Sequence, residues 1–322
     1  MQISVILCTY NRCQTLRQAL ESMAAQVFRE PVEWEVLVVD NNSSDGTREV
    51  VEAFCSRYPG RFRYCFEPEP GLSYARNAGI REVRGNIVAF TDDDIKAEAT
   101  WLQNLTLALR QSGEWAGAGG RILPDRNFSA PRWLSVGRPY ALAPLALFEP
   151  GSKAGPLAEP PFGANMAFRR SMFERYGDFR TDLGRRPGIL VSNEDTEFGN
   201  RLLAHGERFY YEPSAVIYHP VSVERMRKSY FLAWWLAKGR SDMREFGVRP
   251  NKYYFCGIPL YLVRNLIGCT LRWMLGIRPG DRFLNRRTVW YKIGQLYEFY
   301  RPYIAPQNGR AGSANGDAKP FK

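Results

Sequence analysis

Three consecutive carboxylates, Asp92-Asp93-Asp94, follow an apolar run and are the residues of this sequence best suited to bind a metal ion. Carboxylates two positions apart at the end of a strand can point toward one hard cation and toward a diphosphate bound to it. Oxygen ligands of this kind suit Mg²⁺ or Mn²⁺. Three carboxylates this close also repel one another unless a cation neutralises them. The alternative is a solvated acidic turn at the N-terminal dipole of a helix that begins near Thr100.

The elements that must position this triplet alternate between strand and helix. Apolar runs at 3–7 and 36–39 predict buried strands, and 62–66 and 86–91 are interpreted as a third and a fourth strand. Helical spacing of apolar residues after the first run, and again at 72–83, predicts intervening helices. This alternation predicts an α/β fold with a doubly wound, mostly parallel sheet, whose ligands lie beyond the carboxyl ends of the strands. Polar clusters at 9–12, 40–47 and 92–94 occupy those ends.

The rest of the first two hundred residues is less regular. Residues 124–161 are rich in Pro, Gly and Ala and include Trp133, and such a long irregular stretch predicts a functional loop. An amphipathic helix is predicted at 194–206, where Glu194-Asp195 stands at the N-terminus. A short strand at 216–218 is predicted to end at His219.

Charge and composition divide the chain after residue 220. Residues 1–220 contain 25 Lys+Arg and 27 Asp+Glu, a net charge of −2, whereas residues 221–322 contain 19 and 6, a net charge of +13. We therefore predict a near-neutral globular domain at 1–220, a basic, aromatic helical region at 221–304, and a disordered tail at 305–322. The basic excess predicts an anionic partner, either nucleic acid or lipid.

The cysteines and the first residues favour a reducing compartment. The six cysteines form no C-x-x-C pair, and Cys8 lies in an apolar run. The first seven residues have neither a basic segment nor a small-residue cleavage site, so they predict a strand and not a signal peptide. A cytoplasmic location follows as an expectation.

An ordered series of motifs over residues 1–220 resembles family 2 glycosyltransferases. The motifs are SVILCTYNR at 4–12, VVDNNSSDGT at 38–47, GLSYARNAG at 71–79, DDD at 92–94, GANM at 163–166 and ED at 194–195. The chain is most similar to non-processive bacterial enzymes that build exopolysaccharide or other surface glycans. The resemblance implies the GT-A fold and the transfer of one sugar from a nucleotide-diphosphate sugar to a glycan or lipid-linked acceptor.

The resemblance also implies a donor site. Thr9 and Tyr10 would contact the base, the Tyr10 ring by stacking, and Asp40 would accept a hydrogen bond from the base, with uracil favoured. Asp92 would approach the ribose, and the cation would be Mn²⁺ or Mg²⁺. The residues implied for the donor are Thr9, Tyr10, Arg12, Asp40, Arg76, Asp92, Asp93, Gly163 and Asn165, and those implied for the metal are Asp94, Asp92 and His219.

Several of these residues have a structural alternative. Asp40 could be a turn residue that caps the next helix, Arg76 a solvated helix residue, and His219 a structural histidine. Thr47 is interpreted as an N-cap, and Asp45 as a cap or turn residue without a catalytic role.

Glu194 and Asp195 are the catalytic pair that the resemblance implies, with Asp195 as the general base. An acceptor hydroxyl must lose its proton as it attacks an anomeric carbon, and a positioned carboxylate can take that proton. A metal would neutralise the charge that grows on the departing diphosphate. One base and no covalent nucleophile imply inversion in a single step. The alternative for the pair is N-terminal capping, while Gly163 and Asn165 would lie beside the sugar or acceptor.

Motifs that are absent limit the function further. There is no G-x-G-x-x-G after the first strand and no G-x-x-x-x-G-K-[ST], which argues against a dinucleotide-dependent oxidoreductase and a P-loop kinase. The Gln-x-x-Arg-Trp signature of processive polysaccharide synthases is also absent. Two alternatives stay open: a sugar nucleotidyltransferase, and a catalytically inactive glycan- or membrane-binding protein on the same fold.

The basic C-terminal region predicts attachment to an anionic membrane surface. Residues 223–239 mix four cations with Tyr230, Phe231, Trp234 and Trp235, a composition that suits the headgroup level of a bilayer. Apolar runs at 253–263 and 265–271 are too short to span. We expect a peripheral or monotopic protein at the cytoplasmic face of a bacterial inner membrane. The alternative is a helical subdomain packed on the catalytic domain, and nucleic-acid binding is not expected, because no binding module is present.

Overall fold

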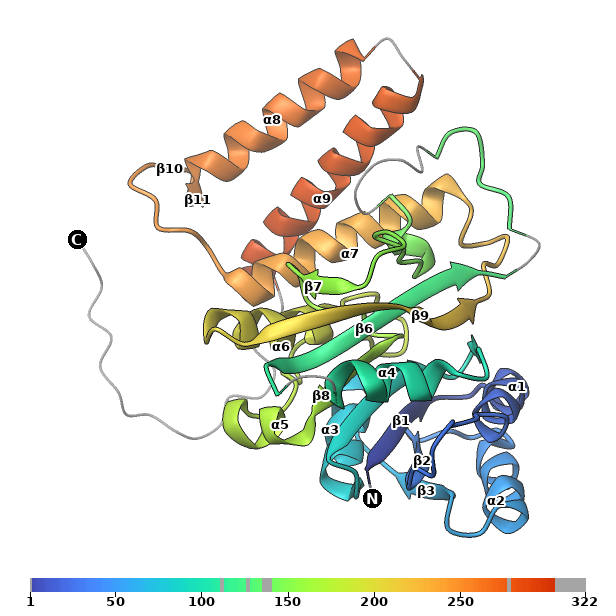
Figure 1. Cartoon of the computed structure of the whole chain (residues 1–322). Helices are drawn as coiled ribbons and strands as arrows, with labels where there is room; N and C mark the ends of the chain where they lie inside the picture. The colour runs from blue at the N-terminus through green and yellow to red at the C-terminus, as the bar shows by residue number, and fades with distance from the viewer. Residues whose placement is uncertain (1, 111–112, 126–127, 135–140, 277–278, 305–322) are drawn as a thin grey trace.

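The computed structural model describes residues 2–110, 113–125, 128–134, 141–276 and 279–304 (Figure 1). Within these residues the central sheet has nine strands. Its first half is parallel and runs in the order β3 (Phe62–Phe66), β2 (Trp34–Asp40), β1 (Ile3–Thr9) and β4 (Ile87–Asp92). The second half is mixed and continues through β8 (Met166–Arg169), β6 (Trp115–Pro124), β9 (Arg208–His219) and β5 (Lys96–Ala97), with β7 (Gly155–Leu157) paired to β9.

Helices cover both faces of this sheet. Successive side chains of a strand point to opposite faces, so in β1 Ile3 and Val5 enter one hydrophobic core while Ile6 enters the other. The first face is covered by α1 (Cys13–Ala24), α2 (Thr47–Arg57) and α4 (Trp101–Arg110), and the second by α3 (Leu72–Glu82), α5 (Arg170–Tyr176) and α6 (Glu194–Ala204). The predicted α/β class and doubly wound sheet are therefore confirmed.

Two local predictions differ from the structure. The strand predicted at 216–218 is the end of the twelve-residue β9, which pairs with β6 both there and in its earlier part. Thr47 is the first residue of α2 and not its N-cap, which is Gly46. Asp45 accepts hydrogen bonds from the Thr47 backbone N–H and hydroxyl, so Asp45 satisfies the helix start.

The segment at 124–161 is anchored to the C-terminal region. It contains a short 3₁₀ turn, η1 (Ala143–Leu145), and β7. The ring of Trp133 lies 4.9 Å from that of Phe231 and 4.6 Å from that of Phe283, both in T-shaped contact. The predicted loop therefore joins the sheet to the helices that follow residue 227.

Three helices form the C-terminal region, α7 (Lys228–Phe246), α8 (Leu260–Leu275) and α9 (Pro279–Ile304), with a small hairpin of β10 (Tyr254–Phe255) and β11 (Ile258–Pro259) before α8. A Cβ on Gly239 would collide with the backbone of Tyr291, and one on Gly294 with the backbone of Leu236, so α7 and α9 cross in direct backbone contact.

α7 and α9 agree with the alternative to membrane attachment, a helical subdomain that packs on the rest of the chain. Phe231 and Trp234, expected at a membrane surface, are buried instead, because α7 lies between the sheet and α9 (Figure 1). Among the helices that the structure describes, none has both the length and the apolar composition to cross a bilayer. The tail at 305–322, expected to be disordered, lies outside the described residues.

Candidate active site

The polar strand ends meet at one edge of the sheet. Thr9 and Asp40 are register neighbours on β1 and β2, Asp92 adjoins β1 at Cys8, and His219 arrives at the end of β9. A cavity of about 640 Å³ opens beside them. It is lined by residues 11–15 at the start of α1 and 220–222, 225 and 226 after β9, together with Asp45, Asp94, Asp125 and Phe128.

Asp92, Asp94 and His219 form a group suited to a divalent cation. One ligand atom from each lies within 4.8 Å of the other two, and His219 Nε2 is 3.5 Å from Asp94 Oδ1. Asp94 Oδ1 and His219 Nδ1 are buried and have no hydrogen-bond partner within the described part of the chain. Two carboxylates and an imidazole suit Mn²⁺ or Mg²⁺, so the residues present fit such an ion.

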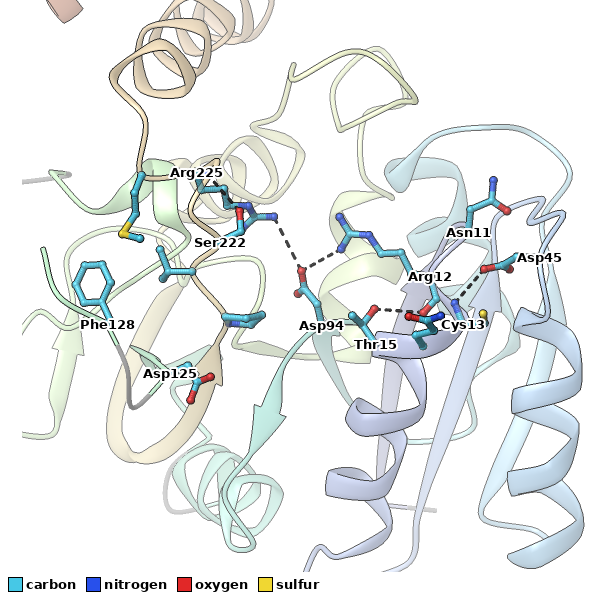
Figure 2. A pocket seen from close by; sticks show the side chains of 14 residues that line it. Asn11, Arg12, Cys13, Thr15, Asp45, Asp94, Asp125, Phe128, Ser222 and Arg225 are labelled. Atoms are coloured by element: carbon cyan, nitrogen blue, oxygen red, sulfur yellow. Dashed lines mark hydrogen bonds and ion pairs between the residues drawn. The ribbon is translucent and has the colours of Figure 1, made fainter. Parts of the chain in front are cut away.

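Two arginines contact the same carboxylate. Figure 2 shows Asp94 between Arg12 and Arg225. Arg12 Nη1 donates to Asp94 Oδ2 at 3.0 Å, while Arg225 Nη2 lies 4.0 Å from that oxygen. Arg225 Nη1 also donates to His219 Nε2 at 3.3 Å. Burial lowers the pKa of His219 against the opposing charge of Asp94, which favours the neutral imidazole that metals bind.

Arg225 was not identified from the sequence. It follows β9 by six residues, in a segment interpreted only as part of the membrane-attachment region. A cation close after a candidate histidine ligand was the available signal. Arg12 and Arg225 together supply two positive charges at the point where an anionic diphosphate would lie.

The middle carboxylate, Asp93, is buried, and Arg12 Nη1 bridges it to Asp94. Its oxygens accept hydrogen bonds from Thr9 Oγ1 at 2.8 Å and Arg12 Nη1 at 3.0 Å. Burial raises the pKa of Asp93 to about 7, although the Arg12 guanidinium opposes the shift. Thr9, expected to contact the base, thus uses its hydroxyl on Asp93, and both residues support the edge of the site from inside.

Asp40 and Tyr10, both expected to contact the base, differ in whether their side chains are already engaged within the protein. Asp40 Oδ1 accepts from the Ser43 backbone N–H and Oδ2 from the Tyr64 hydroxyl, each at 2.9 Å. The contact with Ser43 is the turn contact that the structural alternative for Asp40 predicts. A hydrogen bond from a base N–H would have to use an Asp40 oxygen that already accepts one of these two bonds. The Tyr10 side chain is exposed, so its ring is available for stacking.

Arg76 joins the acidic pair to the loop before β8. It is 4% exposed, which excludes the solvated alternative, and its guanidinium donates to Glu194 Oε1 at 2.8 Å and to the Gly163 carbonyl at 3.3 Å. Burial opposes charging, but the carboxylates of Glu194, Asp195 and Asp92 raise the pKa of Arg76. Arg76 therefore lies electrostatically between the acidic pair and the metal-binding group.

Glu194 and Asp195 have different surroundings. Burial, followed by the Asp195 charge, raises the pKa of Glu194 to about 7, with Arg76 opposing. Asp195 Oδ2 accepts from the Gly163 backbone N–H at 2.9 Å, and its Oδ1 accepts from the Thr196 N–H at 2.8 Å. A Cβ on Gly163 would collide with Asp195 Oδ2, so only glycine permits this approach.

Asn165 points away from this group of residues. Its Nδ2 donates to the carbonyls of Arg121 and Ala215, and its Oδ1 accepts from Trp101 Nε1, all within 2.9 Å. Asn165 was expected beside the sugar or acceptor, but it is fully buried and ties β6, β9 and α4 together. We therefore assign it a structural role.

A polar network that the sequence did not suggest connects the acidic pair to α7. Asn193, directly before Glu194, has a left-handed backbone with φ 82°, a conformation that asparagine tolerates. Its Nδ2 donates to Asp242 Oδ1 at 2.7 Å, and its Oδ1 accepts from Lys238 Nζ at 2.9 Å. Tyr291 of α9 donates to the other oxygen of Asp242 at 2.6 Å. The C-terminal helices therefore orient the start of α6.

The arrangement combines two kinds of chemistry at one edge of the sheet. One part can hold a divalent cation with a diphosphate, and the other presents a carboxylate that can accept a proton. An α/β fold with these features defines a glycosyltransferase of the GT-A type. Residues 4–177 match glycosyl transferase family 2, and the chain belongs to this family.

Named relatives and solved structures agree with this family. The chain is 28% identical to the succinoglycan biosynthesis protein ExoM of Rhizobium meliloti (strain 1021), over 74% of this chain and 72% of that protein. It is also 28% identical to the glucosyl-dolichyl phosphate glucuronosyltransferase of Haloferax volcanii, over 68% and 69% of the two chains.

Two solved structures share the fold. The mannosyltransferase PcManGT from Pyrobaculum calidifontis, in complex with GDP-Man and Mn²⁺, superposes with a TM-score of 0.62 at 19% identity, covering 93% of this chain and 87% of that one. S. aureus TarS 1–349 in complex with UDP superposes with a TM-score of 0.52 at 17% identity, covering 94% and 92%.

Proposed function

We propose that this glycosyltransferase moves one sugar, with inversion, from a nucleotide-diphosphate sugar to a glycan or lipid-linked acceptor. The observation that carries the proposal is the juxtaposition of two groups at one edge of the sheet. Asp92, Asp94 and His219 gather ligand atoms within 4.8 Å, and Arg76 links the neighbouring Glu194 and Asp195 to the same edge. A donor diphosphate and a proton acceptor would thus lie side by side.

Asp94, Asp92 and His219 would hold Mn²⁺ or Mg²⁺. When bound, the ion neutralises the charge that grows on the departing diphosphate. Arg12 and Arg225 lie on Asp94 and would turn toward the phosphate oxygens, where they add positive charge and orient the donor. PcManGT was solved with Mn²⁺, which supports this type of ion.

A UDP-sugar is the favoured donor. The exposed Tyr10 ring would stack on the base, and Asp40 would accept from its N–H. TarS was solved with UDP and with UDP-GlcNAc, which supports a uridine nucleotide, whereas the GDP-Man of PcManGT is the competing donor type. The preference for UDP rests on family resemblance.

Asp195 would act as the general base. The Gly163 N–H holds its Oδ2, and the helix start holds its Oδ1, so the carboxylate is fixed in one orientation. It would accept the proton of the acceptor hydroxyl as that oxygen attacks the anomeric carbon from the face opposite the diphosphate. Glu194, paired with Arg76, would position Asp195.

The acceptor is proposed to belong to surface-polysaccharide synthesis at the cytoplasmic face of a bacterial inner membrane. The names of two relatives support this class, since one concerns succinoglycan biosynthesis and the other a dolichyl phosphate-linked sugar. Without the processive signature in the chain, one sugar is added per encounter.

Substitution of the proposed base tests the function. Asp195→Asn should lower the rate of sugar transfer by about a thousandfold or more, because the amide cannot accept the proton, while nucleotide binding measured by calorimetry stays near wild type. Glu197→Gln is the matched control, since Glu197 lies in the same turn of α6 but bonds Arg201. Retained turnover in Asp195→Asn would remove the residue from the base role. Release of pyrophosphate from a nucleoside triphosphate and a sugar phosphate would replace the proposal with nucleotidyl transfer.

A further inference from the structure

The outward face of α8 exposes a stripe of large apolar side chains. Leu260, Ile267, Leu271 and Met274 recur at helical spacing along it, and Ile267 and Leu271 are 55% and 52% exposed. The opposite face of α8 packs on α9, since Leu262 and Cys269 are buried there. α8 therefore has apolar side chains on two faces, of which one packs on α9 and the other is exposed to solvent.

The hairpin before α8 continues this surface. Tyr253, Tyr254 and Phe255 are all exposed, and they precede the start of α8 at Leu260. Figure 1 shows α8 on the outside of α9, away from the sheet, with the β10–β11 hairpin at one end. Exposed apolar side chains over one helix and an adjoining hairpin form a contiguous patch of the kind that marks an interaction site.

The chain segment that carries the patch has charges of a single sign. No Asp or Glu occurs between Glu245 and Asp281, whereas the same stretch contains five Lys or Arg. Arg264 lies within the apolar stripe, between Leu260 and Ile267, whereas Arg272 lies at its side, and both are exposed, as is Lys252 at the hairpin. A surface of this kind repels a second copy of itself and attracts an anionic one.

We propose that the outer face of α8 and the β10–β11 hairpin, together the α8 surface, dock on a lipid bilayer with anionic headgroups. The helix would lie in the plane of the interface, with its apolar stripe among the upper acyl chains and its arginines at the phosphates. Tyr253 and Tyr254 would lie at headgroup level, where aromatic rings with a polar tip are favoured.

This inference deepens the proposed function, because a lipid-linked acceptor would be presented at such a surface. It also narrows the contact within the region 221–304, for which the sequence predicted attachment. The aromatic residues Phe231 and Trp234 of α7 are buried, whereas the predicted apolar runs at 253–263 and 265–271 include exposed side chains, so the contact is proposed for 253–275 and not for 223–239.

Vesicle co-sedimentation of the full chain tests the proposal without donor, metal or activity. Wild type should bind vesicles of phosphatidylcholine and phosphatidylglycerol in equal parts, bind pure phosphatidylcholine weakly, and lose affinity as salt rises. Ile267→Glu with Leu271→Glu should reduce the partition coefficient by about tenfold or more, since two apolar side chains no longer enter the bilayer. Arg264→Gln should reduce binding to the anionic vesicles alone, by about fivefold.

A matched double variant elsewhere on the surface is the control. Val27 and Leu107 are 53% and 41% exposed on the catalytic domain, so Val27→Glu with Leu107→Glu makes the same change without touching the α8 surface and should leave vesicle binding unchanged. An equal loss of vesicle binding in both double variants would overturn the proposal. So would a wild-type protein that does not co-sediment with anionic vesicles at low salt.

Sedimentation velocity tests whether a second copy of this chain, and not a lipid bilayer, covers the α8 surface. If wild type is a dimer that Ile267→Glu with Leu271→Glu dissociates, and vesicles are not bound, then a second copy covers the α8 surface and the lipid proposal is wrong. Nucleotide binding measured by calorimetry on the same samples distinguishes this failure from failure of the proposed catalytic function, because the α8 substitutions lie outside the candidate active site.

Discussion

At the scale of single residues, the acidic triplet divides into two functions. Asp92 and Asp94 share a side with His219, whereas Asp93 faces inward to Thr9 and Arg12. β4 ends at Asp92, so Asp93 and Asp94 stand in the turn that follows it, and this turn sets the directions of their side chains. Repulsion among the three carboxylates is relieved by Arg12 and Arg225, which a donor diphosphate would draw away from Asp94.

Removing one carboxylate of the metal-binding group tests its role. Asp94→Ala should weaken UDP binding in the presence of Mn²⁺ by at least about tenfold, because the ion that bridges protein and diphosphate loses a ligand. The measurement is a thermal-shift titration of UDP with and without Mn²⁺. Wild type stripped with chelator should match the variant, and a variant that keeps the Mn²⁺-dependent shift would show that Asp94 is not a ligand.

At the scale of elements, α6 depends on α7 for the position of its first turn. Asn193 adopts a left-handed backbone before Glu194 and is held by Lys238 and Asp242, which form an ion pair at 3.0 Å. A non-glycine residue with positive φ costs free energy unless its surroundings hold it. These contacts explain how a helix outside the sheet orients residues at the sheet edge.

Loss of the lysine should therefore affect turnover more than donor binding. Lys238→Met is expected to reduce kcat by about tenfold or more while KM for the donor stays unchanged, because Asp195 shifts relative to the acceptor and the metal-binding group does not. Steady-state kinetics with calorimetric nucleotide binding provide the readout. Lys153→Met is the control, since Lys153 is exposed in the segment before β7, outside the helices α6, α7 and α9 that carry the Asn193 network. A rise in KM for the donor as large as the fall in kcat would show that the substitution disturbs the whole site and not the position of Asp195 alone.

At the scale of the whole molecule, the protein is layered. The sheet with its helices carries the candidate active site, α7 lies on it, α9 packs on α7, and α8 lies outermost (Figure 1). Trp133 extends from the loop after β6 to Phe231 and Phe283, so the catalytic domain and the C-terminal helices share a hydrophobic core. The proposed membrane surface and the candidate active site thus belong to one packed unit.

The glycine contacts between α7 and α9 provide a test of this layering. Gly239→Ala should lower the free energy of unfolding by about 2 kcal/mol or more, because the added methyl would collide with the Tyr291 backbone. Gly268→Ala on α8 meets nothing within 4 Å and should raise it by up to about 1 kcal/mol through helix propensity. Urea unfolding measures both. Similar effects of the two substitutions would contradict the close crossing of α7 and α9.

The sequence by itself determined the features that depend on local pattern. Continuous apolar runs predict strands covered on both faces, and polar residues after each run predict where a ligand would meet the sheet, because parallel strands end at the same edge. This reasoning was sufficient for the fold class and for the positions of β1, β2, β3 and β4, whereas the grouping of Asp92 and Asp94 with His219 was implied by the family resemblance.

Only the tertiary structure decided which polar residues face the site and which surface of the C-terminal region is exposed. Arg76 and Asn165 have ordinary sequence surroundings, but packing turns the first onto Glu194 and the second into the core. Arg225, Asn193 and Lys238 act through partners that lie far away in sequence or in another element. Aromatic and basic residues occur in both α7 and α8, and only the position of α9 buries the face of one and leaves the outer face of the other in solvent. Burial is a property of long-range contacts, which local periodicity does not contain.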